Sequence, residues 1–295
     1  MRYAAIDIGS NAIRLLIASI LTNDGKTTFK KTSLIRVPLR LGDNAFIDHK
    51  ISEKKSEELI KAMIAFKNLM EVYHVEDYMA CATSALREAE NGQELVQRIK
   101  EQAGINLEIV EGQKEANIIY SSHIDQAFDH NKNYLYIDVG GGSTELSVFS
   151  EGKPVASKSF DLGTIRILDH QDKEETWEDL GRWIRTEIKD CKNMIGIGTG
   201  GNINKLFRLA GEKEGKPLSY LKLKAQYERL NAYSLKERIF TLGLNQDRAD
   251  VIIPACHIFL TVMKHAGIKQ IHVPKVGMVD GIINLLIEKN FKTNL

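Results

Sequence analysis

Two segments of the chain combine an acidic residue with a polar turn that contains glycine. They are Asp7-Ile8-Gly9-Ser10-Asn11 and Asp138-Val139-Gly140-Gly141-Gly142-Ser143-Thr144. Because glycine lacks a Cβ, the backbone N–H groups of such a turn can approach a phosphate group closely. Neither turn matches GxxxxGK[ST] or GxGxxG, so neither is a P-loop or a dinucleotide fingerprint. The pair therefore predicts a phosphate site of another kind, with these binding residues: Ser10, Asn11, Gly140, Gly141, Gly142, Ser143 and Thr144.

A third glycine turn lies in the second half of the chain. The apolar run from Met194 to Ile197 leads into Gly198-Thr199-Gly200-Gly201, and helical spacing of apolar residues follows. A turn of this composition serves equally well as a tight connection between a strand and a helix. We expect Gly200 and Gly201 to add backbone N–H groups to the phosphate site.

Three carboxylates accompany the first two turns. Asp7 and Asp138 stand at strand ends, where burial of a carboxylate without a partner is costly, and a bound cation would be such a partner. Glu145 follows Asp138 by seven residues, across the turn on the next strand, so the two carboxylates can converge on one cation. We expect Asp7, Asp138 and Glu145 to bind Mg²⁺ or Mn²⁺. The alternative interpretation places Glu145 on a solvated strand face.

Apolar runs flank both Asp-initiated turns and predict the strands that position them. These runs are Tyr3 to Ile8, Arg14 to Ile20, Tyr134 to Val139 and Glu145 to Phe149. The repeated order of strand, Asp, polar turn and strand indicates an internal duplication, with two halves of similar architecture. Helical periodicity begins after Ser52 and recurs from Val251 to Met263, so strands and helices alternate. This pattern predicts an α/β fold.

The stretch from Glu212 to Gln226 interrupts this pattern. It contains Gly215 and Pro217 and then alternates leucine with lysine, which predicts an exposed excursion with Lys222 and Lys224 on one solvated strand face. Those two lysines are also placed to attract a polyanion.

Composition narrows the range of functions. The 295 residues carry 40 Lys and Arg against 39 Asp and Glu, so the net charge of +1 gives no overall attraction to a nucleic-acid polymer or a membrane surface. Hydrophobic residues make up 43% and charged residues 27%, which are ordinary values for a folded globular protein. At this length, two domains are expected.

Cys81, Cys191 and Cys256 show no metal-ligand spacing and fit a reducing, cytoplasmic location. A symmetric homodimer is the commonest assembly for such chains.

Six motifs, in order, resemble the exopolyphosphatase and guanosine pentaphosphate phosphatase family of the actin-like ATPase superfamily. They are Asp7 to Ile17, Ala82 to Asn91, Ile109 to Ala116, Asp138 to Leu146, Leu162 to Ile167 and Asp247 to Ala255. The resemblance implies two actin-like, ribonuclease H-like α/β domains with a central interdomain cleft. Residues 1–124 and 125–279 would form these domains, with a helix in 280–295 packing back on the first.

The same resemblance implies hydrolysis of a terminal phosphoanhydride bond by water in a site that binds Mg²⁺. Glu115 occupies the position of the family's catalytic glutamate, and Asp138 with Glu145 matches its metal-linked acidic pair. Arg14, Arg87 and Arg248 fall on positions where the family binds phosphate, and guanidinium groups suit phosphate oxygens. Without the resemblance, Glu115 reads as a solvated residue at a helix start, and Arg87 with Glu88 as a surface ion pair.

Some positions depart from the family pattern, and several functions stay open. Lys114 stands where a second acidic residue commonly precedes the catalytic one, Asn117 replaces an arginine, and Pro274 to Gly281 differs from the usual segment. The expected ligand is inorganic polyphosphate or guanosine pentaphosphate or tetraphosphate. The alternatives are an ATP-dependent kinase or ATPase of the same superfamily, and a non-catalytic sensor of polyphosphate or guanosine tetraphosphate.

Overall fold

The computed structural model describes the chain except residues 25, 123–128, 130, 152, 190, 192 and 292–295, and the side chain of residue 120. The chain divides into two compact units. Unit 1 consists of Met1–Ile124 and Val276–Leu295, and unit 2 of Asp125–Lys275. The first expected boundary, after residue 124, lies outside the described residues. The second was expected after residue 279, whereas unit 2 ends at residue 275.

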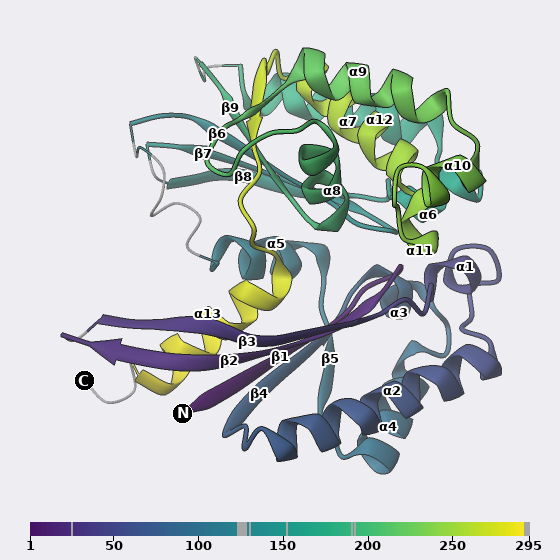
Figure 1. Cartoon of the computed structure of the whole chain (residues 1–295), viewed down its shortest axis with the longest axis vertical. Helices are drawn as coiled ribbons and strands as arrows, with labels where there is room; N and C mark the ends of the chain where they lie inside the picture. Colours follow the sequence, from purple (N-terminus) through teal and green to yellow (C-terminus); the bar gives the residue numbers. More distant parts are fainter. Residues whose placement is uncertain are drawn as a thin grey trace. The chain divides into compact units, whose positions relative to one another are not determined.

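Unit 1 contains a five-stranded sheet with the order β3-β2-β1-β4-β5 (Figure 1). Strand β1 pairs antiparallel with β2 and parallel with β4, β2 pairs antiparallel with β3, and β4 pairs parallel with β5. The strands are β1 (Arg2–Ile8), β2 (Ile13–Asn23), β3 (Lys26–Val37), β4 (Asp77–Ala82) and β5 (Leu107–Ile109). The helices are α1 (Gly42–Ala45), α2 (Glu53–Val72), α3 (Ser84–Glu88), α4 (Gly92–Ala103), α5 (Gly112–Tyr120) and α13 (Met278–Phe291).

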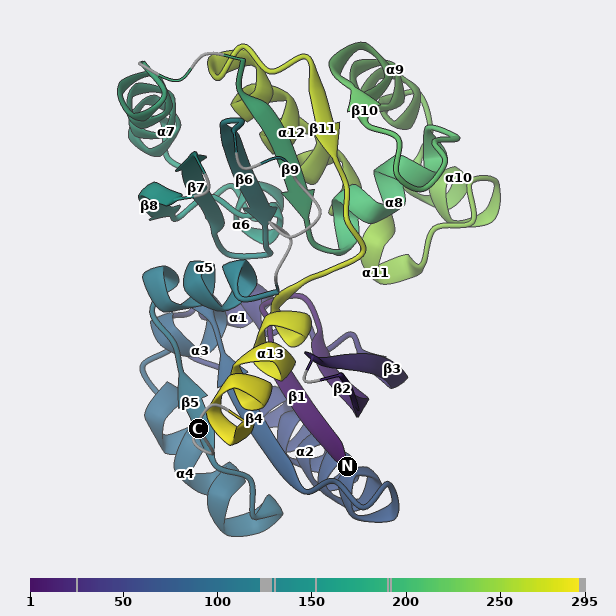
Figure 2. The same cartoon turned by 90° about the vertical axis from the view of Figure 1, so that its left-hand side faces the viewer.

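Helices cover both faces of the unit 1 sheet, with α2 and α4 on one side and α13 on the other (Figures 1 and 2). Alternation along β1 points Tyr3 and Ala5 toward α13, where they share a core with Ile282 and with Ile118 of α5. Gly281 packs against α5 so closely that a Cβ there would overlap the backbone carbonyl of Ile118. Helix α13, which follows unit 2 in the chain, is therefore part of the core of unit 1.

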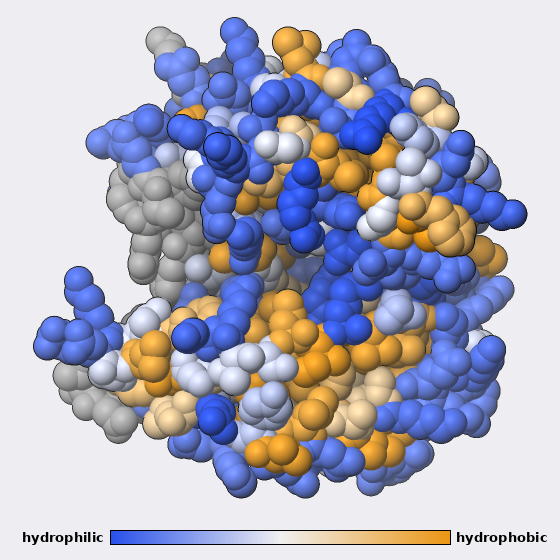
Figure 3. All heavy atoms as spheres, viewed as in Figure 1, coloured by the Kyte–Doolittle hydropathy of each residue, from blue (hydrophilic) through white to orange (hydrophobic). Residues whose placement is uncertain are grey.

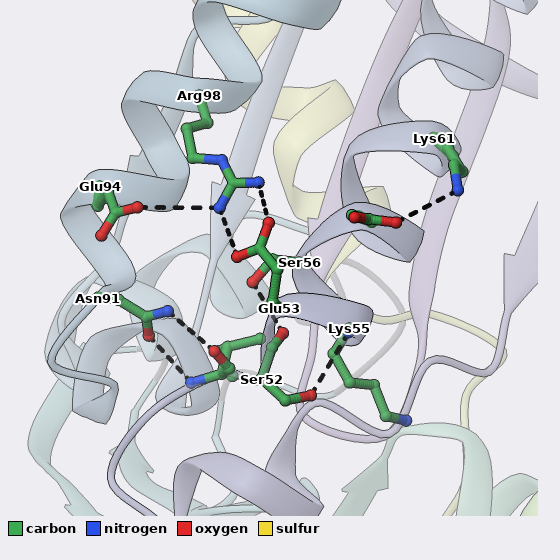
Figure 4. A network of polar contacts seen from close by, with 10 residues as sticks. Ser52, Glu53, Lys55, Ser56, Lys61, Asn91, Glu94 and Arg98 are labelled. Carbon is green, nitrogen blue, oxygen red and sulfur yellow. Dashed lines mark hydrogen bonds and ion pairs between the residues drawn. The ribbon is translucent and has the colours of Figure 1, made fainter.

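Polar contacts hold the start of α2 against α4 (Figure 4). The Ser52 hydroxyl caps α2 by accepting from the Lys55 backbone N–H at 3.5 Å. Buried Asn91 accepts from the Ile51 N–H and donates to the Ile51 carbonyl, both at 2.9 Å. These contacts fix the segment before α2, and the helix that follows confirms the periodicity after Ser52.

Unit 2 contains a six-stranded sheet with the order β10-β11-β9-β6-β7-β8. Its strands are β6 (Tyr134–Val139), β7 (Thr144–Ser150), β8 (Lys153–Phe160), β9 (Ile195–Thr199), β10 (Leu218–Ser219) and β11 (Gln270–His272). Its helices are α6 (Thr164–Leu168), α7 (Glu174–Glu187), α8 (Gly201–Leu209), α9 (Tyr220–Asn231), α10 (Leu235–Phe240), α11 (Gln246–Ala249) and α12 (Ile252–His265).

The two sheets share one topology. The order β8-β7-β6-β9-β11 repeats β3-β2-β1-β4-β5, with the same antiparallel and parallel pairings in the first four strands. The α/β class and the internal duplication are therefore confirmed. In unit 2, Leu135 and Ile137 of β6 and Phe259 of α12 are fully buried in one core, which agrees with the apolar character of the segment after Val251.

The stretch from Glu212 to Gln226 is largely exposed as expected, but the expected strand face over Lys222 and Lys224 is wrong. Residues from Tyr220 onward form α9, whose first turn is capped by the Ser219 hydroxyl, 3.2 Å from the Lys222 backbone N–H. Leu223 is fully buried whereas Leu221 is 75% exposed, so the alternation of leucine and lysine marks a helix that buries a narrow stripe. The Lys222 and Lys224 ammonium groups pair with Glu212 and Glu228 instead of forming a strand face.

Hydrophilic residues cover most of the face seen in Figure 3, and apolar residues gather mainly over unit 1 in that view. Among the described residues, no helix combines the length and apolar character that crossing a membrane requires.

Candidate active site

Each Asp-initiated turn is closed by the same type of backbone hydrogen bond, from a glycine N–H to the carbonyl three residues later. The Gly9 N–H donates to the Ala12 carbonyl at 3.2 Å, and the Gly140 N–H donates to the Ser143 carbonyl at 2.9 Å. The first turn joins β1, which carries Asp7, to β2. The second turn joins β6, which carries Asp138, to β7. The duplication therefore extends to the turns themselves.

Helix α6 orients the turn of unit 2 by binding its carbonyl groups. The Thr164 and Ile165 N–H groups donate to the carbonyls of Gly140 and Gly141 at 3.0 and 2.8 Å. The Arg166 Nε donates to the Gly142 carbonyl at 2.6 Å. Three successive carbonyls of the turn are therefore directed toward α6.

The N–H groups of the same peptide planes are directed the opposite way, because N–H and C=O are trans in a peptide. They belong to Gly141, Gly142 and Ser143, and within the described part of the chain none of them donates to a protein acceptor. Successive backbone N–H groups without a protein acceptor can bind an anion. The Thr144 hydroxyl donates to the Leu162 carbonyl at 2.5 Å, so its side chain holds the turn in place.

A row of polar side chains crosses the unit 2 sheet beside this turn. Asp138 of β6 and Glu145 of β7 are cross-strand partners. The Thr199 hydroxyl donates to Asp138 Oδ1 at 2.7 Å, and the Ser159 hydroxyl donates to Glu145 Oε1 at 2.8 Å. Glu145 is only 3% exposed, so its interpretation as a solvated residue is wrong. Two carboxylates thus face each other at the end of the turn, and each is held by a hydroxyl group.

The donors of this row fit a hard divalent cation. Mg²⁺ is commonly held by one or two carboxylates together with water and substrate phosphates. Gly200 adopts φ +96°, and a Cβ there would stand 3.0 Å from Asp138 Oδ1, so a larger residue at this position would crowd that carboxylate. Among the described residues, no group of three or more His, Cys, Asp or Glu side chains could hold a metal. Any cation at Asp138 and Glu145 would therefore need further ligands from water or phosphate.

The corresponding row in unit 1 has a different charge. Asp7 of β1 faces Arg14 of β2, and Arg14 Nη1 lies 2.5 Å from Asp7 Oδ2. The reason for expecting a cation at Asp7 was the cost of a buried carboxylate without a partner, and Arg14 is that partner. A metal ligand at Asp7 and a phosphate contact at Arg14 stay predictions.

The turn of unit 1 is tied down on its carbonyl side as well. The Ser10 and Asn11 carbonyls accept from the Gly42 and Arg40 N–H groups at 2.9 and 3.0 Å. The buried Ser10 hydroxyl lies 2.9 Å from the Ser84 hydroxyl. Ser10 therefore connects the first turn to the second of the family motifs, which the sequence alone does not show.

Glu115 lies in the first turn of α5 and is 8% exposed, so its interpretation as a solvated residue is wrong. The Arg87 Nη1 lies 3.7 Å from Glu115 Oε2 and donates to the Val110 carbonyl at 2.8 Å. Arg87 thus joins the end of α3 to the entry into α5 and places a positive charge beside Glu115. The neighbouring Lys114 is exposed and pairs with Glu108 at 2.5 Å.

Cys81 on β4 lies between two acidic residues of the unit 1 sheet, because Asp7 of β1 and Glu108 of β5 are its cross-strand neighbours. The Cys81 side chain is fully buried. Burial raises the pKa of the Cys81 thiol to about 12, and the negative charges of Glu108, Asp7 and Glu115 contribute to that increase. The Asp7 and Glu115 carboxylates are therefore both within electrostatic range of this thiol.

Arg248 packs over the third glycine turn in unit 2. Its Nη1 donates to the Gly201 carbonyl at 2.6 Å, and a Cβ at Gly201 would stand 3.0 Å from Nη2. The expected phosphate residues Gly200, Gly201 and Arg248 therefore lie together at the start of α8, next to Asp138.

The predicted residues thus form two half-sites, one in each unit. Sequence reasoning missed the groups that hold them, namely Ser84, Thr199 and Ser159 and the backbone N–H groups of α6. Thr199 lies within the third glycine turn, so the sequence pattern could have identified it. Ser84 and Ser159 reach the site only through strand pairing, which the local sequence does not indicate. That the two half-sites meet in one interdomain cleft stays a prediction.

Comparisons with known proteins point to one family. The model of the Ppx/GppA phosphatase family matches residues 22–290. Exopolyphosphatase 1 of Mycobacterium leprae is 22% identical over 96% of this chain and 88% of its own length. A putative exopolyphosphatase of Haemophilus influenzae is 25% identical over 98% of this chain and 92% of its own length.

A solved structure shows the same architecture. The crystal structure of the Aquifex aeolicus member of the Ppx/GppA family is 25% identical, covers 99% of both chains and superposes with a TM-score of 0.75. The expected fold of two actin-like domains is confirmed. With its duplicated sheets, its paired turns and the family match over most of its length, this chain belongs to the Ppx/GppA phosphatase family.

Proposed function

We propose that this protein hydrolyses phosphoanhydride bonds and releases the terminal phosphate of inorganic polyphosphate, with guanosine pentaphosphate as a further substrate of the same chemistry. Family membership and the names of the exopolyphosphatase relatives support this proposal. The observation that carries it is the turn from Gly140 to Ser143. Its carbonyls are bound by α6, its N–H groups are directed away from α6, and a facing pair of carboxylates adjoins it.

In this reaction, a water oxygen forms a bond to the terminal phosphorus while the bond from that phosphorus to the bridging oxygen breaks. Glu115 orients the water and accepts its proton, and Arg87, whose Nη1 lies 3.7 Å from Glu115 Oε2, binds the phosphate oxygens beside that carboxylate. The N–H groups of Gly141 and Gly142 stabilise charge on the phosphate oxygens. A Mg²⁺ ion held by Asp138 and Glu145 would supply additional positive charge to those oxygens. The proposal requires both half-sites to act on one phosphate chain.

The decisive experiment compares three substrates. The purified protein is incubated with polyphosphate, guanosine pentaphosphate or ATP, with and without Mg²⁺, and released orthophosphate is measured. Release from polyphosphate that depends on Mg²⁺ supports the proposal. Release from ATP alone would instead identify an ATPase, and binding of polyphosphate without release would identify a sensor.

A further inference from the structure

We propose that Lys205 and Arg208 of α8, continuing from Arg248, bind the distal part of a polyphosphate chain, beyond the reacting phosphate. We call these three residues the α8 basic stripe. The inference rests on the proposed function, because it assigns to the same site a preference for long linear polyanions.

The stripe runs outward from the third glycine turn. Positions 201, 205 and 208 are four and three residues apart and therefore share one face of α8. Arg248 covers the beginning of that face through its bond to the Gly201 carbonyl. Seven residues of α-helix span about 10 Å, so the positive charges extend well past a single phosphate group. Figure 2 shows α8 and α11, the helices that carry the stripe, side by side in unit 2.

No acidic side chain neutralises the two α8 residues within the described part of the chain. The Lys205 Nζ donates to the Gly243 carbonyl and the Arg208 Nε donates to the Asn204 carbonyl, each at 3.2 Å. Both acceptors are uncharged, so these bonds orient the side chains and leave their charge uncompensated. Lys222 and Lys224 of α9 differ, because each of them pairs with a glutamate.

The electrostatic environment of Lys205 agrees with this description. Burial lowers the pKa of Lys205, and the positive charges of Arg208 and Arg248 lower it further. The three cations are therefore close enough to repel one another. A bound polyanion would relieve that repulsion, whereas a ligand without charge would not.

The α8 basic stripe would distinguish substrates by the length of their phosphate chain. A substrate with few phosphates is bound by the glycine turns alone, whereas a long chain can continue along α8. Guanosine pentaphosphate carries its phosphates on a nucleoside and cannot extend in this way. The stripe therefore favours long polyphosphate over both tripolyphosphate and the nucleotide.

The test uses the double variant Lys205→Gln/Arg208→Gln, with steady-state kinetics on long-chain polyphosphate, tripolyphosphate and guanosine pentaphosphate. Exposed charge contacts are individually weak, so we expect KM for the long chain to rise by roughly three- to tenfold relative to KM for tripolyphosphate. This difference should shrink as ionic strength increases, because salt screens exposed charges. The charge-conserving variant Lys205→Arg/Arg208→Lys should restore most of the long-chain KM.

The matched control is Lys222→Gln/Lys224→Gln, which removes two positive charges from ion-paired positions on α9. An equal increase of KM in this control, or equal effects on long and short substrates, would overturn the proposal and leave the hydrolytic function standing. If the wild-type protein hydrolyses no phosphate substrate, the proposed function is wrong. In that case, calorimetry measures the affinity of the wild-type protein and of Lys205→Gln/Arg208→Gln for long-chain polyphosphate. An unchanged affinity in the variant would refute the role of the α8 basic stripe.

Discussion

The contact between Gly281 and Ile118 leads to a quantitative prediction for Gly281→Ala. A Cβ at this position would lie far inside 3.0 Å of the Ile118 carbonyl oxygen, a separation that real Cβ contacts essentially never fall below. Because the opposing atom belongs to the backbone, α13 must move away from α5. Overpacking of this kind costs about 1–3 kcal/mol. Loss of the 2.7 Å bond from Asn284 to the Ser121 carbonyl adds about 1 kcal/mol.

We therefore expect the free energy of unfolding of unit 1 to fall by about 2–4 kcal/mol, a large part of the stability of an ordinary domain. The assay uses a difference between the units. Both tryptophans of the chain, Trp177 and Trp183, lie on α7 in unit 2. Urea unfolding followed by circular dichroism reports both units, whereas tryptophan fluorescence reports unit 2. The variant should shift the first signal and leave the fluorescence midpoint nearly unchanged.

Gly277→Ala is the matched control in the same segment. A Cβ at Gly277 would meet nothing within 4 Å, and its N–H bond to Asp280 is kept. We expect a change within about 0.5 kcal/mol for this variant. If Gly281→Ala is as stable as Gly277→Ala, or if it shifts the fluorescence midpoint equally, the packing of α13 on α5 does not support unit 1 in the way that we describe.

Three further variants test the site and its support. Glu115→Gln keeps the shape of the side chain but cannot accept a proton, so kcat should fall by ~10²–10⁴-fold with little change in substrate affinity, and a turnover within about threefold of wild type would reject Glu115 as the catalytic residue. Asp138→Asn should abolish most Mg²⁺-dependent phosphate release while circular dichroism stays unchanged, and surviving metal dependence would move the cation elsewhere. Asn91→Ala leaves the buried Ile51 N–H and carbonyl without partners and should cost about 2–3 kcal/mol in urea unfolding. A cost below about 0.5 kcal/mol would mean that water replaces both bonds.

Local sequence signals identified the strands that carry the site but not the strands at the sheet edges. The continuous apolar runs predict β1, β2, β6 and β7 because these strands are buried. Strands β3 and β8 lie at the edges of their sheets, where one side of the strand faces solvent. Their mixed composition gives no clear period, so they are recognised only when their pairing partners are known.

The same limit applies to the site. A spacing of seven residues predicted that Asp138 and Glu145 converge, because a short turn fixes the register between two strands. The identical spacing from Asp7 to Arg14 produces an ion pair, which follows from the same geometry and the opposite charge. The hydroxyl of Ser159 reaches Glu145 through a further strand pairing. That contact depends on tertiary structure and has no counterpart in local sequence.

The placement of α13 also sets an order for synthesis on the ribosome. Every strand and helix of unit 2 precedes residue 276, so unit 2 has its complete set of elements before α13 is made. Unit 1 begins first but lacks the helix that covers Tyr3, Leu16 and Ala18 until the last segment emerges. During elongation, the earlier unit therefore presents an uncovered apolar sheet face while the later unit can already fold. The nascent chain is most exposed to misassociation in this interval, and a chaperone that binds apolar strands would act on the residues made first.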